Sequence, residues 1–350
     1  MKVKHGGDWA GYQTEYGKLA LDFSANVSPL GLPDGVHRAA VRALDAAERY
    51  PDPDCRTLRE KISAFHRVPE ENIVCSNGAA DLIDRICRTL RPRCAVLDIP
   101  EFGEYARALE AEGCRIRTVR RREEENFLLD TEAMIAEADD AEIMFLSNPN
   151  NPTGLLTSRE NLQMILDRCR EKHLMLVLDE CFLELTDHPE AFSMISYLSE
   201  VPELVILRAF TKTYAMAGLR LGYALCGSRE TASALQDCGQ PWPVSHIAQE
   251  AGIAALNEEN YVNQLRRMIS KERPRLKDAL SQLGLRVIPG TANYLLFQSM
   301  DGTLHDKLRR QGILIRDCGG EDGLSAGWYR VAVRTEEEND RLIQVMREVL

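Results

Sequence analysis

Short apolar runs alternate with longer amphipathic segments from about residue 72 onward, and this alternation constrains the fold most strongly. Strands that alternate with helices predict an α/β fold with a mostly parallel sheet covered by helices on both faces. Strands buried on both faces should be almost entirely apolar, and these runs are. The seven expected strands are residues 72–76, 94–99, 114–119, 142–147, 174–179, 203–209 and 221–226, with helical patterns between many of them, for example 78–90, 103–112 and 158–172.

The pattern changes after residues 239–245, where a long helical stretch begins. This stretch runs from about 246 to 282, and Pro274 should kink or break it. The first 30 residues show few helical signals. We therefore expect an N-terminal arm over 1–30 that packs across the junction, a large domain over 31–245 and a small α+β domain over 246–350. The small domain should hold strands near 285–288, 293–298, 313–316 and 329–333 and helices near 302–311 and 335–349.

Charge and composition exclude several classes of protein. The chain has 43 basic and 54 acidic residues, so its net charge of −11 disfavours binding to nucleic acid or to an anionic membrane surface. The basic cluster 120–122 runs straight into the acidic cluster 123–125, which is typical of a solvated turn. No apolar stretch is long enough to span a membrane, and the first residues lack the apolar region of a secretory signal.

The ten cysteines are scattered, without a C-x-x-C pair or a zinc spacing. Several of them lie inside apolar runs, where cysteine behaves as a small hydrophobic residue. We therefore expect no metal site and a reducing, cytoplasmic location.

One lysine stands at the end of an expected buried strand, in the stretch ILRAFTKTYAMAGLRLGY (206–223). A lysine becomes a nucleophile when a shielded site or a nearby cation makes its ammonium lose the proton more easily. Most lysines are simply solvated, and Lys212 could be one of these. Arg220 follows eight residues later, however, and two cations that converge on one cavity indicate an anionic ligand. Gly218 and Gly222 leave room for a close approach of the backbone.

Two further stretches follow expected strands, at the end where parallel sheets bind ligands. In LSNPNNPTG (146–154), Asn151 could offer its amide to a ligand oxygen, although a simple turn explains the same sequence. In LVLDEC (176–181), Asp179 could receive a protonated ring nitrogen. A metal is disfavoured there because no histidine or further carboxylate stands at a matching spacing.

A fourth stretch, CSNGAAD (75–81), combines a strand, a glycine turn and the start of a helix. Free N–H groups at such a helix start bind phosphate without any side chain. Neither G-x-x-x-x-G-K-[ST] nor G-x-G-x-x-G is present, so ATP and NAD lack support. An amine, a carboxylate, an amide and a phosphate seat together match pyridoxal phosphate, whose protonated ring is an electron sink.

The motifs NPNNPTG, LDE, TK and GLRLGY resemble those of the fold-type I, aspartate aminotransferase-like enzymes that use pyridoxal phosphate. The resemblance covers nearly the whole chain. Within these enzymes the chain is most similar to the threonine-phosphate decarboxylases of cobalamin biosynthesis, which are related to histidinol-phosphate aminotransferases. The stretches that carry this finer resemblance are HGGD (5–8), LDFSANVSPLG (21–31), RYPDPDCRTLRE (49–60), QPWPVS (240–245), PGTANYLLF (289–297), ILIRDC (313–318) and YRVAVRTEEEN (329–339).

The resemblance implies a role for each matching residue toward the cofactor. Lys212 would bond covalently to the cofactor aldehyde and later move protons at the substrate α-carbon. Asp179 would pair with the ring nitrogen and Asn151 with the phenolic oxygen. The remaining cofactor residues would be Phe102, stacked on the ring, and Gly78, Ala79, Thr211, Arg220 and Tyr50 around the phosphate. Tyr50 would come from a second copy of the chain, which implies a homodimer.

The resemblance also implies a substrate with two anionic groups. Arg330 would bind its carboxylate, because a planar guanidinium suits a carboxylate better than a lysine does. Arg316 would bind its phosphate. Further candidates at the substrate end are His5, Asn26 and Arg334.

Two positions depart from the usual pattern of the wider superfamily. Phe182 stands where many aminotransferases carry a tyrosine that bonds the phenolic oxygen. Ala209 stands where a serine commonly bonds the cofactor phosphate, and a missing contact of this kind costs on the order of 1 kcal/mol.

The expected activity is decarboxylation of L-threonine O-3-phosphate to (R)-1-amino-2-propanol O-2-phosphate. An aminotransferase acting on a phosphorylated amino compound would use the same residues and is the main alternative. A serine-phosphate decarboxylase and a non-catalytic regulator that binds pyridoxal phosphate are two further alternatives.

Overall fold

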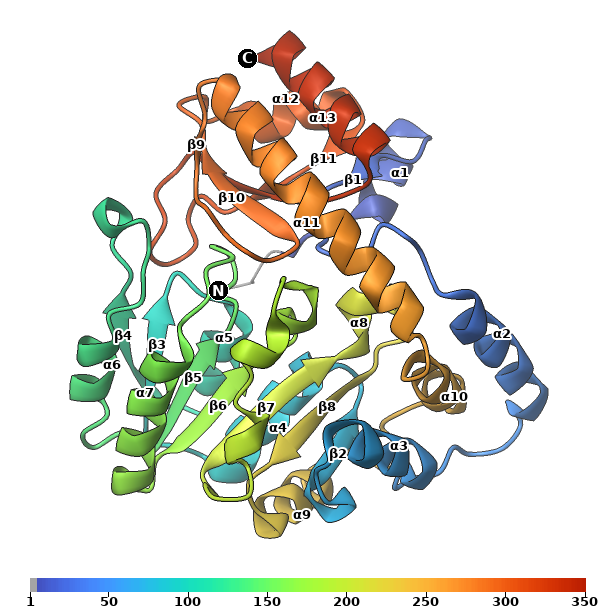
Figure 1. The fold of residues 1–350 in the computed structure, drawn as a ribbon, viewed down its shortest axis with the longest axis vertical. Helices are drawn as coiled ribbons and strands as arrows, with labels where there is room; N and C mark the ends of the chain where they lie inside the picture. Colours follow the sequence, from blue (N-terminus) through green and yellow to red (C-terminus); the bar gives the residue numbers. More distant parts are fainter. Residues whose placement is uncertain (1–4) are drawn as a thin grey trace.

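The computed structural model describes residues 5–350, and its largest element is a seven-stranded sheet (Figure 1). Strand β8 is antiparallel to both of its neighbours, and the other pairs are parallel. The predicted sheet is confirmed, with every strand boundary within one residue of expectation. The strand order is β2 (Ile73–Ser76), β8 (Gly222–Cys226), β7 (Leu204–Ala209), β6 (Met175–Asp179), β5 (Ile143–Ser147), β3 (Cys94–Ile99) and β4 (Arg115–Arg120).

Helices cover both faces of this sheet because successive strand residues point to opposite faces. Along β6, Leu176 and Leu178 belong to one buried cluster and Val177 to the other. The first cluster includes residues of α3 (Arg56–His66), α6 (Thr131–Glu137), α7 (Arg159–Lys172) and α10 (His246–Ala255). The second includes residues of α4 (Ala79–Leu90), α5 (Glu104–Ala111) and α9 (Arg229–Asp237). Helix α2 (Asp34–Ala43) packs against α10, and the short α8 (Phe210–Thr213) follows β7.

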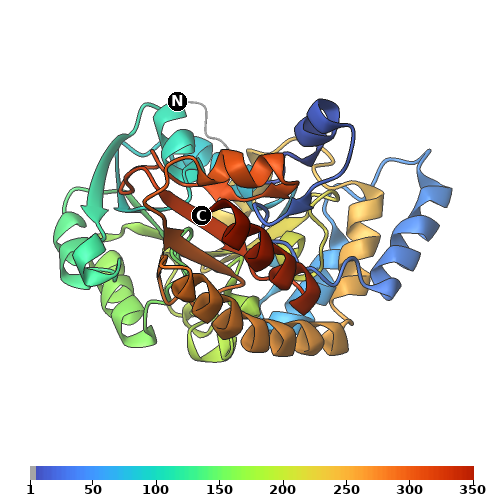
Figure 2. The same ribbon diagram turned by 90° about the horizontal axis from the view of Figure 1, so that it is seen from above.

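A smaller sheet lies above the carboxyl end of the large one (Figure 1, Figure 2). Its antiparallel strands are, in order, β12 (Arg316–Asp317), β13 (Trp328–Ala332), β10 (Tyr294–Gln298) and β9 (Arg286–Val287). Helices α11 (Glu259–Gln282), α12 (Leu304–Arg310) and α13 (Glu336–Val349) share a separate buried core with it. The short β1 (Leu21–Asp22) pairs in parallel with β11 (Ile313–Leu314), so the N-terminal segment is bound to this part of the molecule. The domain boundaries at residues 30 and 245 stay predictions.

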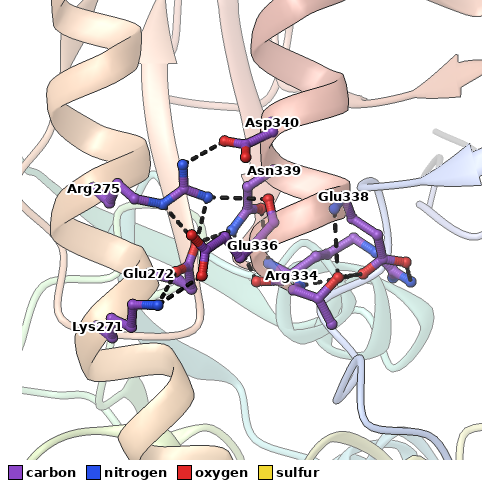
Figure 3. A network of polar contacts seen from close by, with 9 residues as sticks. Lys271, Glu272, Arg275, Arg334, Glu336, Glu338, Asn339 and Asp340 are labelled. Atoms are coloured by element: carbon purple, nitrogen blue, oxygen red, sulfur yellow. Dashed lines mark hydrogen bonds and ion pairs between the residues drawn. The ribbon is translucent and has the colours of Figure 1, made fainter.

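Helices α11 and α13 are joined by a network of charged side chains (Figure 3). Glu272 is almost completely buried and accepts hydrogen bonds from Arg275 at 2.6 Å and from Asn339 at 3.0 Å. Lys271 pairs with Glu336 at 2.6 Å on the exposed side. The network holds α13 against the long helix that reaches back to the large sheet (Figure 1).

Three local expectations were wrong. The clusters at 120–125 are not simply a solvated turn, because Arg121 is buried and its Nε donates to Oδ2 of the buried Asp98. The N-terminal segment contains a helix, α1 (Trp9–Tyr16), which begins at Asp8, whose side chain accepts from the Gly11 N–H at 3.1 Å. Only Tyr12 of this helix is buried, so the sequence lacked the apolar stripe by which helices are recognised. Pro274 does not break the C-terminal helical stretch, because α11 runs through it and the break falls at residues 256–258 instead, while the expected kink stays a prediction. Leu265, Ile269 and Leu276, buried on one side of α11, hold it together across the proline.

No helix within residues 5–350 combines the length and the apolar character that crossing a bilayer requires. All ten cysteines are free thiols, and only Cys238 is not buried. Among the residues that the structure describes, no group of three or more histidine, cysteine or acidic side chains is placed to hold a metal ion.

Candidate active site

The polar residues singled out in the sequence gather where the strands of the large sheet end. Asp179 is the last residue of β6 and lies beside Ser147, the last residue of β5. Lys212 lies on α8 directly after β7, and Gly78 lies between β2 and α4. The carboxyl edge of the sheet therefore brings together residues that are up to 134 positions apart, as the alternating pattern predicted.

Asp179 is held in one orientation by two donors. Its Oδ2 accepts a hydrogen bond from the Tyr105 hydroxyl at 2.7 Å, and its Oδ1 accepts from the Cys181 N–H at 2.9 Å. Tyr105 is buried and stacks on Phe145 with ring centroids 5.0 Å apart. Burial, and then the negative charge of Asp179, raise the pKa of Tyr105, so the phenol stays a donor. A carboxylate fixed in this way can receive a protonated ring nitrogen.

Lys212 has the environment of a nucleophilic amine. Burial first, and then the positive charges of Arg330 and Arg220, lower its pKa from 10.5 to about 8. Its ammonium lies 5.6 Å from the centroid of the Phe182 ring. A minor fraction of this side chain, on the order of a tenth at pH 7, is therefore neutral and able to act as a nucleophile.

The start of α4 forms a cradle from which side chains are excluded. Gly78 has a φ of 87°, and a Cβ built on it would lie 2.8 Å from Nη2 of Arg220. A Cβ on Gly222 would lie 2.6 Å from the backbone nitrogen of Ala79. No side chain caps this end of α4, so its N–H groups and the exposed Arg220 can take an anion, while Thr211 is buried in α8.

Asn151 connects the large sheet to the small one. Its Oδ1 accepts a hydrogen bond from Nη1 of Arg330, and its own N–H donates to Ser147 Oγ at 3.3 Å. Nη2 of Arg330 donates to the Ser24 carbonyl at 3.2 Å, and the guanidinium lies over the Tyr294 ring at 5.4 Å. All these partners are uncharged, so the charge of Arg330 remains available to an anionic ligand.

Arg316 starts from the position directly opposite Arg330 on the neighbouring strand, because their Cα atoms are partners in the β12–β13 ladder. Its guanidinium already has a carboxylate partner. Both Nη2, at 2.5 Å, and Nε, at 3.2 Å, donate to Oε1 of Glu321. Two arginines thus project from facing positions, and one of them is neutralised internally.

The other predicted residues lie at the margins of this arrangement. His5 contacts Glu104 at 2.8 Å, and its ring lies 6.0 Å from that of Phe102, which packs edge-on against Tyr105. Asn26 is buried, and within residues 5–350 its Oδ1 has no hydrogen-bond partner.

Two predicted residues make none of these contacts. The side chain of Tyr50 is 78% exposed and stacks on Trp242 at 4.4 Å, on the outside of this single chain. Arg334 donates to the Asp22 carbonyl at 3.0 Å and to Glu338 at 2.7 Å, so it binds the N-terminal segment to α13.

Sequence reasoning missed three residues of the site. Tyr105 and Glu321 were not considered, and neither was Glu101, which is buried and has an unpartnered Oε2 among the described residues. Burial, and then the charges of Asp98 and Glu321, raise the pKa of Glu101 well above its usual value. The only available signal was position, since Glu101 and Tyr105 flank Phe102 in PEFGEY (100–105).

A lysine with a lowered pKa, an oriented carboxylate and an anion cradle at one sheet edge fit pyridoxal phosphate, and with the fold they define a fold-type I, aspartate aminotransferase-like enzyme. Comparison with known proteins gives the family. Residues 19–346 match the family described as aminotransferase class I and II. The chain belongs to this family, and it is an enzyme that depends on pyridoxal phosphate.

Three individual relatives illustrate the range of this similarity. The chain is 40% identical to a threonine-phosphate decarboxylase of Salmonella typhimurium, over 94% of this chain and 91% of the relative. It is 31% identical to a histidinol-phosphate aminotransferase of Archaeoglobus fulgidus, over 95% and 94% of the two chains. The crystal structure of the histidinol-phosphate aminotransferase from Clostridium acetobutylicum superimposes with a TM-score of 0.88 at 29% identity, over 94% of this chain and 98% of that one.

Proposed function

We propose that the protein decarboxylates L-threonine O-3-phosphate to (R)-1-amino-2-propanol O-2-phosphate. The observation that carries this proposal is the pair of arginines, Arg316 and Arg330, at facing positions of adjacent strands. Arg330 acts on the reactive lysine, and Arg316 faces Arg330 on the next strand, an arrangement that suits an amino acid with a carboxylate and a second anionic group. The 40% identity to a threonine-phosphate decarboxylase supports phosphate as that second group.

The proposal assigns the cofactor to the residues at the sheet edge. Asp179 receives the ring nitrogen, Asn151 faces the phenolic oxygen and Phe102 covers the ring. The phosphate would be held by the N–H groups of Gly78 and Ala79, by Thr211 and by Arg220, and Lys212 would be the residue that holds the aldehyde. Pyridoxal phosphate, when bound, supplies an electron sink that stabilises negative charge at the substrate α-carbon.

The chain's own residues then decide which bond of the substrate breaks. Arg330 binds the substrate carboxylate and Arg316 the phosphate, so the substrate is held at both ends and its α-carbon is oriented. This orientation would decide whether the α-carbon loses its carboxylate or its proton. Lys212, with a pKa of about 8, exists in both protonation states near neutral pH and can return a proton to the α-carbon.

His5 and Asn26 are proposed to line the substrate end of the site. His5 contacts Glu104 beside Phe102, and the buried Asn26 carries an unpartnered Oδ1 within residues 5–350. For Arg334 we propose an indirect role. Its two bonds, to the Asp22 carbonyl and Glu338, position the N-terminal segment from which Ser24 contacts Arg330.

We also propose that the protein is a cytoplasmic homodimer in which each copy completes the other's cofactor site. The exposed Tyr50, stacked on Trp242, is the residue that would reach the phosphate of the second copy. The ten free thiols suit a reducing compartment.

Assays with alternative substrates test the proposed activity. Carbon dioxide release from L-threonine phosphate should fall by at least about 100-fold in Arg330→Gln and in Arg316→Gln, because each loses a charged contact of roughly 3 kcal/mol. L-serine phosphate should react more slowly, since one methyl group is worth about 1–3 kcal/mol of discrimination. Full activity of either variant would overturn the assignment of the two arginines.

The second candidate function is transamination of a phosphorylated amino compound. The 31% identity to a histidinol-phosphate aminotransferase favours it, and the same residues would serve. The two activities differ in whether the α-carbon loses its carboxylate or its proton. A non-catalytic regulator would show neither product.

A further inference from the structure

We propose that Glu321 acts as an internal occupant of the substrate-phosphate site, holding Arg316 until a doubly charged group displaces it. The inference rests on the proposed function in one respect, namely that Arg316 binds the phosphate of the substrate. It adds a residue that sets the affinity and the selectivity of that site. Four features of the described residues carry it.

The first feature is the geometry of the contact between Glu321 and Arg316. Oε1 of Glu321 accepts from both Nη2, at 2.5 Å, and Nε, at 3.2 Å. Nε and one terminal nitrogen form the edge of a guanidinium with which an arginine binds a phosphate or a carboxylate. Glu321 therefore occupies the donors that an anionic substrate group would need.

The second feature is the difference between the two facing arginines. Arg330 contacts an amide oxygen, a carbonyl oxygen and an aromatic ring, all of them uncharged. Arg316 carries a carboxylate, and only 12% of its side chain is exposed. Like charges at facing strand positions repel one another. The Glu321 carboxylate, bound to one of the two arginines, therefore stabilises the site while no substrate is bound.

The third feature is the way in which the loop holds Glu321. The Glu321 N–H donates to the Cys318 carbonyl at 3.1 Å, and the Glu321 carbonyl accepts from Leu324 at 3.0 Å. Leu324 is buried, and a Cβ on Gly323 would lie 2.7 Å from the backbone nitrogen of Pro100. The backbone is thus fixed against the end of β3, and a rotation of the Glu321 side chain is enough to free Arg316.

The fourth feature is the position of Glu321 relative to the floor of the site. Glu101, which precedes Phe102 in the chain, is buried, and burial first, then the charges of Asp98 and Glu321, raise its pKa. The carboxylate of Glu321 is therefore close enough to add to the negative potential there. An entering anion meets less repulsion once Glu321 has turned away.

The consequence is a selection by charge. A glutamate carries one negative charge, whereas a phosphate monoester carries about −1.5 to −2 at neutral pH and offers three acceptor oxygens. A phosphorylated substrate can displace Glu321, and the unphosphorylated amino acid, which has no anion at this end, cannot. Glu321 thus lowers the affinity of the Arg316 site for every anion, and it excludes from this site amino acids that carry no phosphate.

The test measures binding of inorganic phosphate to the holoenzyme, whose cofactor seat is already filled, by isothermal titration calorimetry. In Glu321→Gln the dissociation constant should fall about five-fold, the effect of losing a partly exposed ion pair of roughly 1 kcal/mol. In Arg316→Gln phosphate should bind more weakly than in the unchanged protein. In the double variant, which combines Glu321→Gln with Arg316→Gln, phosphate should bind no more tightly than in Arg316→Gln alone.

Asp322→Asn is the matched control, because it removes the same charge from the next residue, which is exposed. An equal gain in Asp322→Asn, or a gain from Glu321→Gln that persists without Arg316, would show a general effect of charge and overturn the proposal. Unchanged or weaker binding in Glu321→Gln would overturn it as well. Far-UV circular dichroism and the melting temperature check that the variants fold.

This outcome can be separated from a failure of the proposed function. Phosphate binding needs no turnover, so it reports on Glu321 even if L-threonine phosphate releases no carbon dioxide. If Glu321→Gln tightens phosphate and the gas assay is negative, the phosphate site stands and the reaction assignment falls. If the gas assay is positive and phosphate binding is unchanged, only the role of Glu321 falls.

Discussion

The Tyr105 hydroxyl donates a 2.7 Å hydrogen bond to Oδ2 of Asp179 and joins α5 to the end of β6. The two residues are 74 positions apart, and both side chains lie at the carboxyl edge of the sheet. This bond fixes the orientation of the carboxylate that would face the cofactor ring nitrogen. We therefore propose that Tyr105 positions Asp179 for the cofactor.

Tyr105→Phe should weaken cofactor binding about 10- to 100-fold, because a hydrogen bond to a charged group is worth roughly 1.5–3 kcal/mol. Equilibrium dialysis of the cofactor against the apoprotein measures this. Tyr12→Phe is a suitable control, since the buried Tyr12 hydroxyl has no partner within residues 5–350. Equal cofactor affinities in the two variants would show that the bond to Asp179 has no such role.

Lys212→Met should stabilise the apoprotein at pH 7. Lys212 has a pKa of about 8 when folded and 10.5 as its ordinary value, so the unfolded chain binds more protons between these limits and stability rises with pH there. At pH 7 the lysine is largely protonated in both the folded and the unfolded chain, and burying the charge costs on the order of 1–3 kcal/mol. Urea unfolding should therefore show a gain for the variant at pH 7 that shrinks by pH 10. A loss of stability at pH 7 would contradict the lowered pKa.

Ala209→Ser should strengthen cofactor binding about five-fold, by restoring a hydroxyl worth roughly 1 kcal/mol where relatives commonly have one. Ala209 ends β7, three residues before Lys212, and it is only partly buried, so the extra oxygen can be accommodated. The rate of cofactor loss by dialysis is the measurement. Faster loss than in the unchanged protein would mean that the phosphate lies elsewhere.

Mixed subunits test whether Tyr50 acts across a dimer. Lys212→Ala lacks the covalent link, and Tyr50→Ala should bind cofactor poorly. A mixture of the two variants should regain cofactor binding. In each mixed dimer, one site combines the intact Lys212 of the Tyr50→Ala copy with the intact Tyr50 of the Lys212→Ala copy. Tyr50→Phe keeps the stacking on Trp242 and serves to separate packing from the hydroxyl contact. No recovery in a mixture that demonstrably exchanges subunits would place Tyr50 outside the site.

The sequence predicted the large sheet well for a physical reason. Strands such as Ile143–Ser147 are buried along their whole length, and such runs stand out against the polar segments that flank them. Lys212 and Asp179 stand at the ends of such runs, and they could be recognised as candidate site residues because ligands bind at the carboxyl ends of strands. Helix α1 has no apolar stripe and gave no such signal.

Contacts between distant segments were beyond reach of the sequence. The bond from Tyr105 to Asp179 depends on how α5 packs on the sheet, which no local pattern encodes. Arg316 and Glu321 are only five residues apart, yet their contact depends on the loop that turns between β12 and β13. Arg334 was placed at the substrate end by resemblance alone. It donates to the Asp22 carbonyl and to Glu338, and its role toward the substrate stays a prediction.

The central claim is that the arginines orient the substrate so that the carboxylate bond breaks. The direct measurement is the product balance when pure holoenzyme is mixed with L-threonine phosphate, with carbon dioxide and pyridoxamine phosphate followed in parallel. We predict one carbon dioxide per substrate consumed, over many turnovers, with negligible pyridoxamine phosphate. Stoichiometric pyridoxamine phosphate without release of carbon dioxide would contradict the account and identify the protein as an aminotransferase.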